Sequence, residues 1–92
     1  MSTKYVLLYE SAEDVAETAP VHYPAHSARL QRFAEDGTLL LVGPFADPRA
    51  HGSMAVFTSR EAVEEFVAAD PFVLNGVVVG WEVREWHEVL AA

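Results

Sequence analysis

The sequence predicts an α+β domain in which two helices cover one face of a four-stranded antiparallel sheet. Three observations lead to this prediction. Segments rich in β-branched and aromatic residues alternate with segments of helical periodicity in the order strand, helix, strand, strand, helix, strand. The 92 residues suffice for one domain, residues 1–92, and no linker, repeat or low-complexity tract divides them. This order is that of the ferredoxin-like βαββαβ fold.

The N-terminal part of the chain is expected to hold the first strand and the first helix. Residues 4–10 predict a strand, whereas the acidic, alanine-containing residues 11–18 predict a loop or a short helical turn. Helical periodicity extends from Pro20 to Asp36, with Pro24 in the first turn, where its missing N–H leaves no acceptor unpaired. Gly37 is expected at the left-handed position that ends the helix. The expected buried stripe of this helix consists of Leu30, Phe33 and Ala34.

The middle of the chain predicts two strands joined by a connection rich in turn-forming residues. Residues 38–42 form the second strand, which ends at Gly43 and Pro44. The connection over residues 45–52 contains proline, aspartate and glycine, and we expect the third strand over residues 53–57.

The remaining residues predict the second helix and the last strand. Thr58 and Glu61 have the spacing of a capping box, in which two side chains satisfy the first N–H groups of a helix. Asp70 precedes a proline and should end this helix, because the residue before proline avoids helical geometry. A turn over residues 72–76 then leads to the fourth strand over residues 77–89. The expected buried stripe of the helix consists of Val63, Phe66 and Val67.

The strands carry more apolar residues than a sheet covered on one face requires. An antiparallel sheet with one solvated face should alternate apolar and polar residues. Residues 6–8, 39–42 and 54–57 are instead apolar at consecutive positions, and hydrophobic residues make up 51% of the chain. Both faces of the sheet are therefore expected to be buried, the second one in a homodimer formed sheet against sheet.

Charge and composition exclude several classes of function. The net charge is −8, and the six basic residues form no cluster, so we expect no binding to nucleic acid. The absence of cysteine excludes disulfides and thiolate chemistry. No apolar run approaches the roughly 20 residues that span a bilayer, and the first residues lack a signal-peptide pattern. A cytoplasmic protein without contact to a membrane is the expectation.

Strand direction brings residues from distant parts of the sequence to one end of the predicted sheet. The first strand and the second helix end there, and the first helix and the third strand begin there. His26, at the start of the first helix, and Asp70, at the end of the second, are therefore expected to lie close together. The other residues expected at this end are Tyr9, Gly43, Pro44, Ser53 and Phe72.

A histidine next to a carboxylate is a candidate acid–base pair. A carboxylate that accepts from one imidazole nitrogen fixes the tautomer and leaves the other nitrogen free to take a proton. His26 oriented by Asp70 could thus abstract a proton from a phenol or from a carbon beside a carbonyl. The alternative is structural: a buried histidine whose hydrogen bond is satisfied by an aspartate that caps a helix.

The other residues at this end allow two interpretations each. Tyr9, Ser53 and Phe72 could bind a small aromatic ligand, or Tyr9 and Phe72 could cover the core. Gly43 would let a ligand approach the backbone, but Gly43-Pro44 is also typical of a tight turn.

A metal site is the less favoured alternative. His22 and His26 have the i, i+4 spacing of zinc ligands, and Glu10, His51 or Asp70 could complete a set. Pro24 lies between the two histidines, so His22 is expected before the helix and pointing elsewhere. We therefore predict neither a metal nor an organic cofactor.

Four short motifs in order resemble the landmarks of the YCII-related family. The motifs are Pro24-Ala25-His26 with Leu30, Gly37-Thr38-Leu39, Gly43-Pro44-Phe45 and Ala69-Asp70-Pro71-Phe72. Together they cover nearly the whole chain. The resemblance implies a ferredoxin-like fold that forms a dimeric α+β barrel, with an active site around His26 and Asp70. Ser27 departs from the pattern, because the family leads us to expect an apolar residue after the histidine.

Three functions follow, in order of preference. The first is a small cofactor-independent enzyme that uses His26 and Asp70 in an elimination or isomerisation of a small aromatic or enolisable compound. The resemblance supports it, because the family includes a dehydrochlorinase of a chlorinated hydroxyquinol. The second is a module that binds a small molecule in the same pocket without converting it. The third is a dimeric interaction domain.

Overall fold

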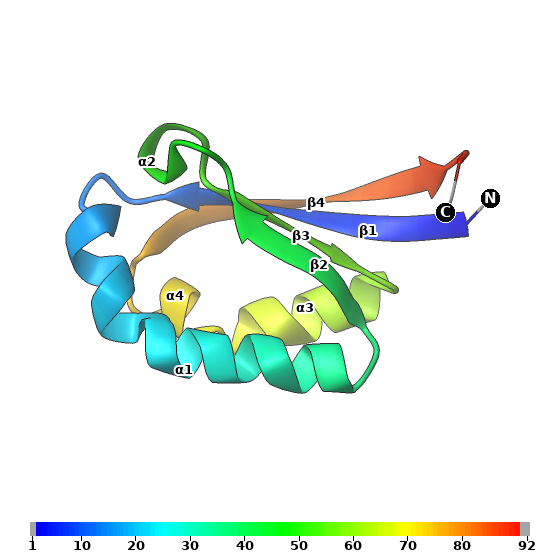
Figure 1. Cartoon of the computed structure of the whole chain (residues 1–92), viewed down its shortest axis with the longest axis horizontal. Coiled ribbons are helices and arrows are strands. Elements are labelled where there is room, and N and C mark those ends of the chain that lie inside the picture. The colour runs from blue at the N-terminus through cyan, green and yellow to red at the C-terminus, as the bar shows by residue number, and fades with distance from the viewer. Residues whose placement is uncertain (1, 91–92) are drawn as a thin grey trace.

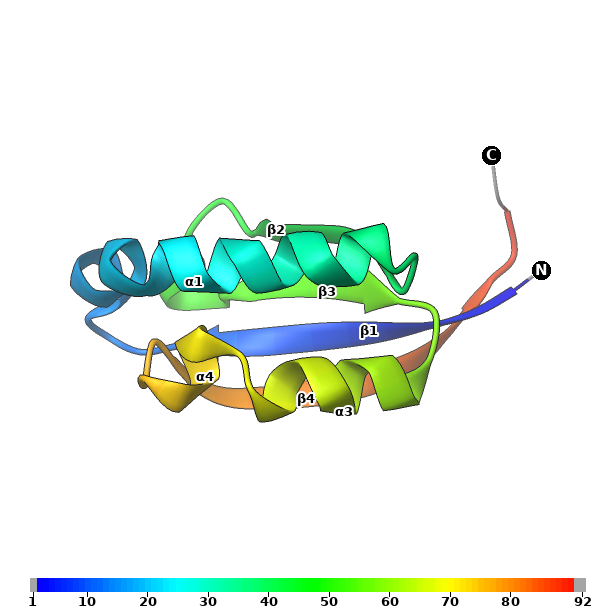
Figure 2. The same ribbon diagram turned by 90° about the horizontal axis from the view of Figure 1, so that it is seen from below.

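The computed structural model of the chain describes residues 2–90 and has the predicted ferredoxin-like α+β arrangement (Figures 1 and 2). The four strands form one antiparallel sheet in the order β2-β3-β1-β4, and α1, α3 and α4 lie together on one face of it, whereas the short α2 lies on the other side of the strands, where β2 ends (Figure 1). The strands are β1 (Ser2–Ser11), β2 (Leu39–Pro44), β3 (Ser53–Phe57) and β4 (Val78–Glu88). The helices are α1 (Val15–Glu35), α2 (Pro48–His51), α3 (Arg60–Ala68) and α4 (Pro71–Leu74).

The register of the central strand β1 decides which side chains face the helices. Leu7 pairs with Ala55 of β3 and with Val83 of β4, and Tyr9 pairs with Ser53 and Trp81. Directly opposite residues share a face of the sheet, and successive residues alternate between faces. Leu7 and Tyr9 are buried under the helices, so their neighbours on β1 point to the outer face.

The core between sheet and helices is aromatic at its centre. Phe33 of α1 meets Phe66 of α3 edge to face, with ring centroids 5.2 Å apart, and Phe57 of β3 packs against both. The predicted stripe of the second helix is confirmed, because Val63, Phe66 and Val67 are all buried. In the stripe of the first helix Phe33 is buried and Leu30 is half-buried, but Ala34 is exposed, so the prediction for Ala34 was wrong.

Helix α1 begins five residues earlier than predicted, at Val15 rather than Pro20. Of the segment 11–18, Ser11 ends β1, residues 12–14 form the expected loop, and residues 15–18 belong to the helix. Pro20 and Pro24 therefore lie inside the helix, and the placement of Pro24 in the first turn was wrong. Both prolines are exposed and lie one turn apart, so the carbonyls that lose an N–H partner lie on the solvent side, where water can replace it.

Three local predictions near the second helix also need correction. The helix begins after Ser59, whose hydroxyl accepts from the Ala62 N–H at 3.1 Å, and not at a Thr58–Glu61 capping box. It ends at Ala68, before Asp70. The predicted turn over residues 72–76 contains most of α4, for which Asp70 is the N-cap. Elsewhere, Gly37 follows α1 with a φ of +80°, as predicted for a helix end.

The outer face of the sheet is uncovered in the described chain. Leu41 of β2 is 67% exposed and Trp86 of β4 is 48% exposed, and both lie on the face opposite to the helices. The register places the apolar Val6, Leu8 and Met54 on this face together with the charged Lys4, Glu82 and Arg84. The expected burial of this face in a homodimer stays a prediction. Within residues 2–90, none of the helices combines the length and the apolar character that a membrane crossing requires.

Candidate functional site

His26 and Asp70 form a buried pair between the middle of α1 and the start of α4, so the expectation that His26 lies at the start of its helix was wrong. His26 lies on α1 and Asp70 at the start of α4, and Nδ1 of the imidazole is 2.7 Å from Oδ1 of the carboxylate. His26 is 7% exposed and Asp70 is fully buried. The distance in sequence is 44 residues, so strand and helix direction, rather than a local motif, brings the two side chains together.

Asp70 accepts hydrogen bonds from three sides. Oδ1 accepts from the imidazole of His26 and from the backbone N–H of Phe72 at 3.1 Å. Oδ2 accepts from the hydroxyl of Tyr9 at 2.6 Å. A buried carboxylate is stable as an anion only when such donors replace water. Because this carboxylate accepts, a neutral imidazole carries its proton on Nδ1 and its lone pair on Nε2. Among residues 2–90 Nε2 has no hydrogen-bond partner, and it is not a fully buried atom.

The ring of His26 is held by aromatic neighbours. Phe72 lies parallel to it, with centroids 3.7 Å apart and an interplanar angle of 2°. Phe66 contacts it edge to face at 6.2 Å. These contacts cover one face and one edge of the imidazole, so its orientation is fixed by packing as well as by Asp70.

A pocket of about 370 Å³ opens beside His26, between α1 and the ends of β2 and β3. Four of the five residues expected to contact a ligand line it together with His26: Gly43, Pro44, Ser53 and Phe72. The fifth, Tyr9, lines a small adjoining hollow together with His26 and Ser53. Whether the five residues bind a substrate stays a prediction.

Several lining residues were not singled out from the sequence. Val15 lies in the segment 11–18 that was expected to be a loop or a short helical turn, Ala19 directly precedes the predicted helix, and Tyr23 lies within it. Their spacing continues through His26 to Leu30 with steps of three and four residues, which is a helical stripe. The helical periodicity was thus present in the sequence, but Pro20 and Pro24 indicated a helix that starts further along the chain. The other lining residues that were not predicted are Ser11, Leu30, Val42, Pro48, Gly52, Val77 and Val78.

The pocket is nearly uncharged, although the chain is acidic. None of its lining residues is Lys, Arg, Asp or Glu. Burial, and then the hydrogen bond to Asp70, raises the pKa of Tyr9, so this phenol stays neutral next to the pair.

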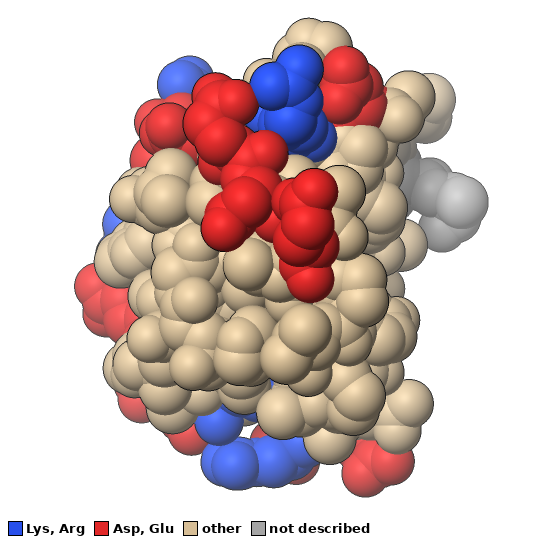
Figure 3. Space-filling model, turned by 90° about the vertical axis from the view of Figure 1, so that its left-hand side faces the viewer, with Lys and Arg blue, Asp and Glu red and all other residues tan. Residues whose placement is uncertain are grey.

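Figure 3 shows the end of the molecule with α2 and the start of α1: acidic side chains gather in its upper part above a wide uncharged surface. Glu13, just before α1, pairs there with Arg49 of α2 at 3.0 Å.

The structure gives no support to the metal alternative in the described residues. Helix α1 includes both His22 and His26, so the expectation that His22 precedes the helix was wrong. No three potential His, Asp or Glu ligands converge anywhere in residues 2–90.

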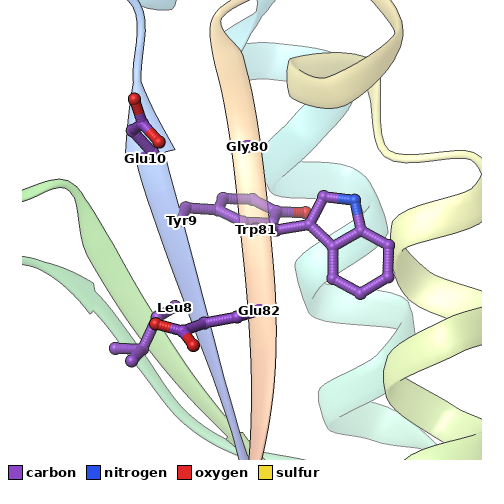
Figure 4. Close-up of a pocket in the computed structure, with 6 residues that line it drawn as sticks. All are labelled: Leu8, Tyr9, Glu10, Gly80, Trp81 and Glu82. Carbon is purple, nitrogen blue, oxygen red and sulfur yellow. The ribbon is translucent and has the colours of Figure 1, made fainter.

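A hollow on the other face of the sheet lies over Gly80 between β1 and β4 (Figure 4). Figure 4 shows Leu8 and Glu82 on that side of the strands, whereas Tyr9 and Trp81 extend to the opposite side.

Comparison with known sequences matches nearly the whole chain to one family. The family model for the YCII-related domain matches residues 3–87. Protein YciI of Escherichia coli O6:H1 is 35% identical over 95 residues, which cover 92% of this chain and 97% of that protein. Protein YciI of Shigella flexneri matches to the same extent.

Comparison with solved structures finds the same fold. The 5-chloro-2-hydroxyhydroquinone dehydrochlorinase from Burkholderia phenoliruptrix, in complex with 2,5-dihydroxybenzoquinone, superposes with a TM-score of 0.73. It is 20% identical, and the match covers 91% of this chain and 93% of that one. A hypothetical protein of Arabidopsis thaliana is 19% identical, with a TM-score of 0.51 over 99% of this chain and 91% of that one. At these identities the likeness concerns the fold alone.

Proposed function

This chain belongs to the family of YCII-related domains, and from that premise we propose that it is a small cofactor-independent enzyme whose general base is His26. Asp70 orients the imidazole and stabilises the imidazolium that forms when Nε2 takes a proton. The reaction class is proton abstraction followed by elimination or isomerisation. The substrate is a small aromatic or enolisable compound.

One observation supports this proposal above all others. Nε2 of His26 has no hydrogen-bond partner in the described chain, while Nδ1 is held by a fully buried carboxylate, at the wall of a pocket. A histidine that served only packing would need no such combination. The proton that Nε2 removes can return to another atom of the substrate in an isomerisation, or leave with a departing group in an elimination.

The size and lining of the pocket support the substrate class. A volume of about 370 Å³ lies near the lower limit of typical small-molecule sites, which run from roughly 300 to 1,000 Å³. Apolar side chains without a cation favour an uncharged ring over a carboxylate or a phosphate. The Burkholderia enzyme, a dehydrochlorinase on the same fold that was solved with a quinone, provides an analogy for elimination from a ring.

The test is turnover of a panel of phenols and enolisable carbonyl compounds by wild type and by two variants. We expect His26→Gln and Asp70→Asn each to lower kcat by about 10²- to 10⁴-fold, the usual contribution of an acid–base group. His22→Gln is the matched control, because it changes a histidine on the same helix that does not line the pocket. Normal turnover by both site variants would show the assignment to be wrong.

A second function, binding without conversion, is favoured by the parallel stack of Phe72 on His26. The two parallel rings are fixed in the wall of the pocket, where the ring of a ligand could pack against them whether or not a proton is transferred. A compound that copurifies with the chain, is lost in Leu30→Trp, and is recovered chemically unchanged after incubation would support this function over catalysis.

We further propose that the chain acts as a homodimer through the outer face of its sheet. Leu41 and Trp86 are exposed there, next to the apolar residues Val6, Leu8 and Met54. Sedimentation equilibrium should give twice the chain mass for wild type and a single chain mass for Leu41→Glu. A monomeric wild type would contradict the dimer without affecting the proposal for His26. The cytoplasm remains the location that we expect.

A further inference from the structure

Tyr9 contacts the buried pair from strand β1, next to the pocket. Its hydroxyl donates to Oδ2 of Asp70 at 2.6 Å, and its side chain is buried under the helices. It does not line the pocket beside His26, although it lines a small adjoining hollow of about 20 Å³ together with His26 and Ser53. Within residues 2–90 its hydroxyl bonds to Asp70, so the hydroxyl acts on the site through that carboxylate.

The two oxygens of Asp70 do not have equal numbers of donors. Oδ1 accepts from His26 and from the N–H of Phe72, whereas the hydroxyl of Tyr9 is the donor to Oδ2 within residues 2–90. The carboxylate is fully buried, so no water replaces a missing donor. Without the hydroxyl, Oδ2 would be a buried anionic oxygen without a partner, and the carboxyl group would bind a proton more readily.

A proton on Asp70 would reverse the hydrogen bond to His26. The neutral carboxylic acid donates, so Nδ1 would have to accept, and the imidazole proton would move to Nε2. The pair gains one proton from solvent in this exchange: Asp70 takes it up, and the imidazole keeps its single proton, now on the other nitrogen. The nitrogen that faces the pocket would then carry hydrogen and could no longer act as a base.

We propose that Tyr9 is the positioning residue of this site: its hydroxyl keeps Asp70 ionised, and the ionised Asp70 keeps the imidazole proton on Nδ1, so that Nε2 of His26 stays free. This inference rests on the proposed function only for its consequence in turnover. The effect on the tautomer of His26 holds whether or not the chain is an enzyme.

The neighbouring groups do not replace this hydroxyl. Arg29 is the cation near Tyr9, but its Nε donates to the carbonyl of Phe66 at 3.1 Å and its Nη2 to the carbonyl of Glu65 at 2.8 Å. Phe72 contributes only its backbone N–H, and that bond goes to Oδ1. Helix α1, strand β1 and helix α4 thus provide His26, Tyr9 and one N–H, and no further donor to Oδ2 among the described residues.

The experiment reads the tautomer of His26 directly. In protein labelled with ¹⁵N-histidine, two-bond correlations from the ring protons distinguish Nδ1–H from Nε2–H near neutral pH. We expect Nδ1–H in wild type, and in Tyr9→Phe an increase of about tenfold in the ratio of Nε2–H to Nδ1–H, the size of effect of one charge-assisted hydrogen bond. Tyr5→Phe is the matched control, since Tyr5 lies on the same face of β1 and has no bond to Asp70.

The outcomes separate this inference from the proposed function. A folded Tyr9→Phe protein with an unchanged tautomer would overturn the role of Tyr9. If that variant does not fold, the wild type decides: a slowly exchanging downfield hydroxyl proton on Tyr9 supports the inference, and its absence overturns it. Once a substrate is found, Tyr9→Phe should lower kcat about tenfold and leave KM unchanged, because Tyr9 does not line the pocket. A changed tautomer combined with full activity of His26→Gln would retain the inference and reject the enzyme.

Discussion

The space between the sheet and the helices is filled differently at its two ends. Towards the end of α1, three phenylalanine rings contact one another, and Phe57 is fully buried. Towards the start of α1, the pocket opens, and the histidine at the middle of that helix forms a buried polar cluster with a tyrosine and an aspartate next to it. The apolar end can be filled completely because its side chains need no specific partners. The polar end must keep the pocket open and provide an acceptor for every buried donor.

Phe66 forms the boundary between these ends. One edge contact joins it to Phe33, and another joins it to His26. The apolar end therefore supports the polar one, since the wall that fixes the imidazole is itself anchored in the core. The residues that stabilise the fold therefore differ from those that set the geometry of the site, and the two groups meet at Phe66.

The largest effect on stability is expected from the apolar end. Phe57→Ala removes a fully buried ring and leaves a cavity, which should lower the free energy of unfolding by about 3–5 kcal/mol. Urea denaturation followed by circular dichroism measures the change. Val79→Ala, at an exposed position, should cost less than about 1 kcal/mol. Similar losses for the two variants would contradict the account of this end.

The polar end should separate stability from turnover. Asp70→Ala leaves the Tyr9 hydroxyl and the Phe72 N–H buried without an acceptor, so we expect a loss of about 2–3 kcal/mol. Asp70→Asn keeps an acceptor oxygen in place and should cost roughly 1 kcal/mol, while abolishing the ionised partner of His26. The same denaturation experiment compares them. Equal losses would indicate that the charge, and not hydrogen bonding, stabilises this end.

The pH dependence of the free energy of unfolding should show the contribution of the buried Tyr9 hydroxyl. Burial raises its pKa in the folded chain above the usual value near 10, so the folded state retains a proton that the unfolded state releases. The stabilisation is complete below pH 10, roughly the unfolded pKa, and declines as the pH rises further. Tyr9→Phe should flatten the fall in unfolding free energy between about pH 10 and 11, relative to Tyr5→Phe. An equally steep fall in both variants would contradict this.

The smallest effect is expected at an exposed pair far from the site. The hydrogen bond from Lys4 lowers the pKa of Glu88, where β1 and β4 pair near their outer ends. This contribution is present above the unfolded pKa of the carboxyl group and is lost as the pH falls through the folded pKa. Lys4→Met should move the acid unfolding midpoint only slightly, because solvent screens exposed charges. A large shift of the midpoint would contradict the contrast between buried and exposed partners.

The sequence was sufficient for the fold because each element carries its own periodicity. The third strand and the buried stripe of α3 were predicted as found, and strand direction alone brought His26 to Asp70. The start of α1 was missed because proline is a strong signal for a helix end, and packing against the sheet outweighed it. The bond from Tyr9 to Asp70 depends on side-chain depth, which alternation along a strand does not reveal.

Pro20 and Pro24 have a consequence for how a molecule could reach the pocket. Each removes one backbone donor from the turns that carry Ala19 and Tyr23, so these turns are held by fewer hydrogen bonds than the rest of α1. Their amide protons should exchange with deuterium earlier than those around Phe33, through local opening of this segment rather than unfolding of the whole chain. The start of α1, where the helix has the fewest backbone hydrogen bonds, would then be the part of the pocket wall through which a ligand enters.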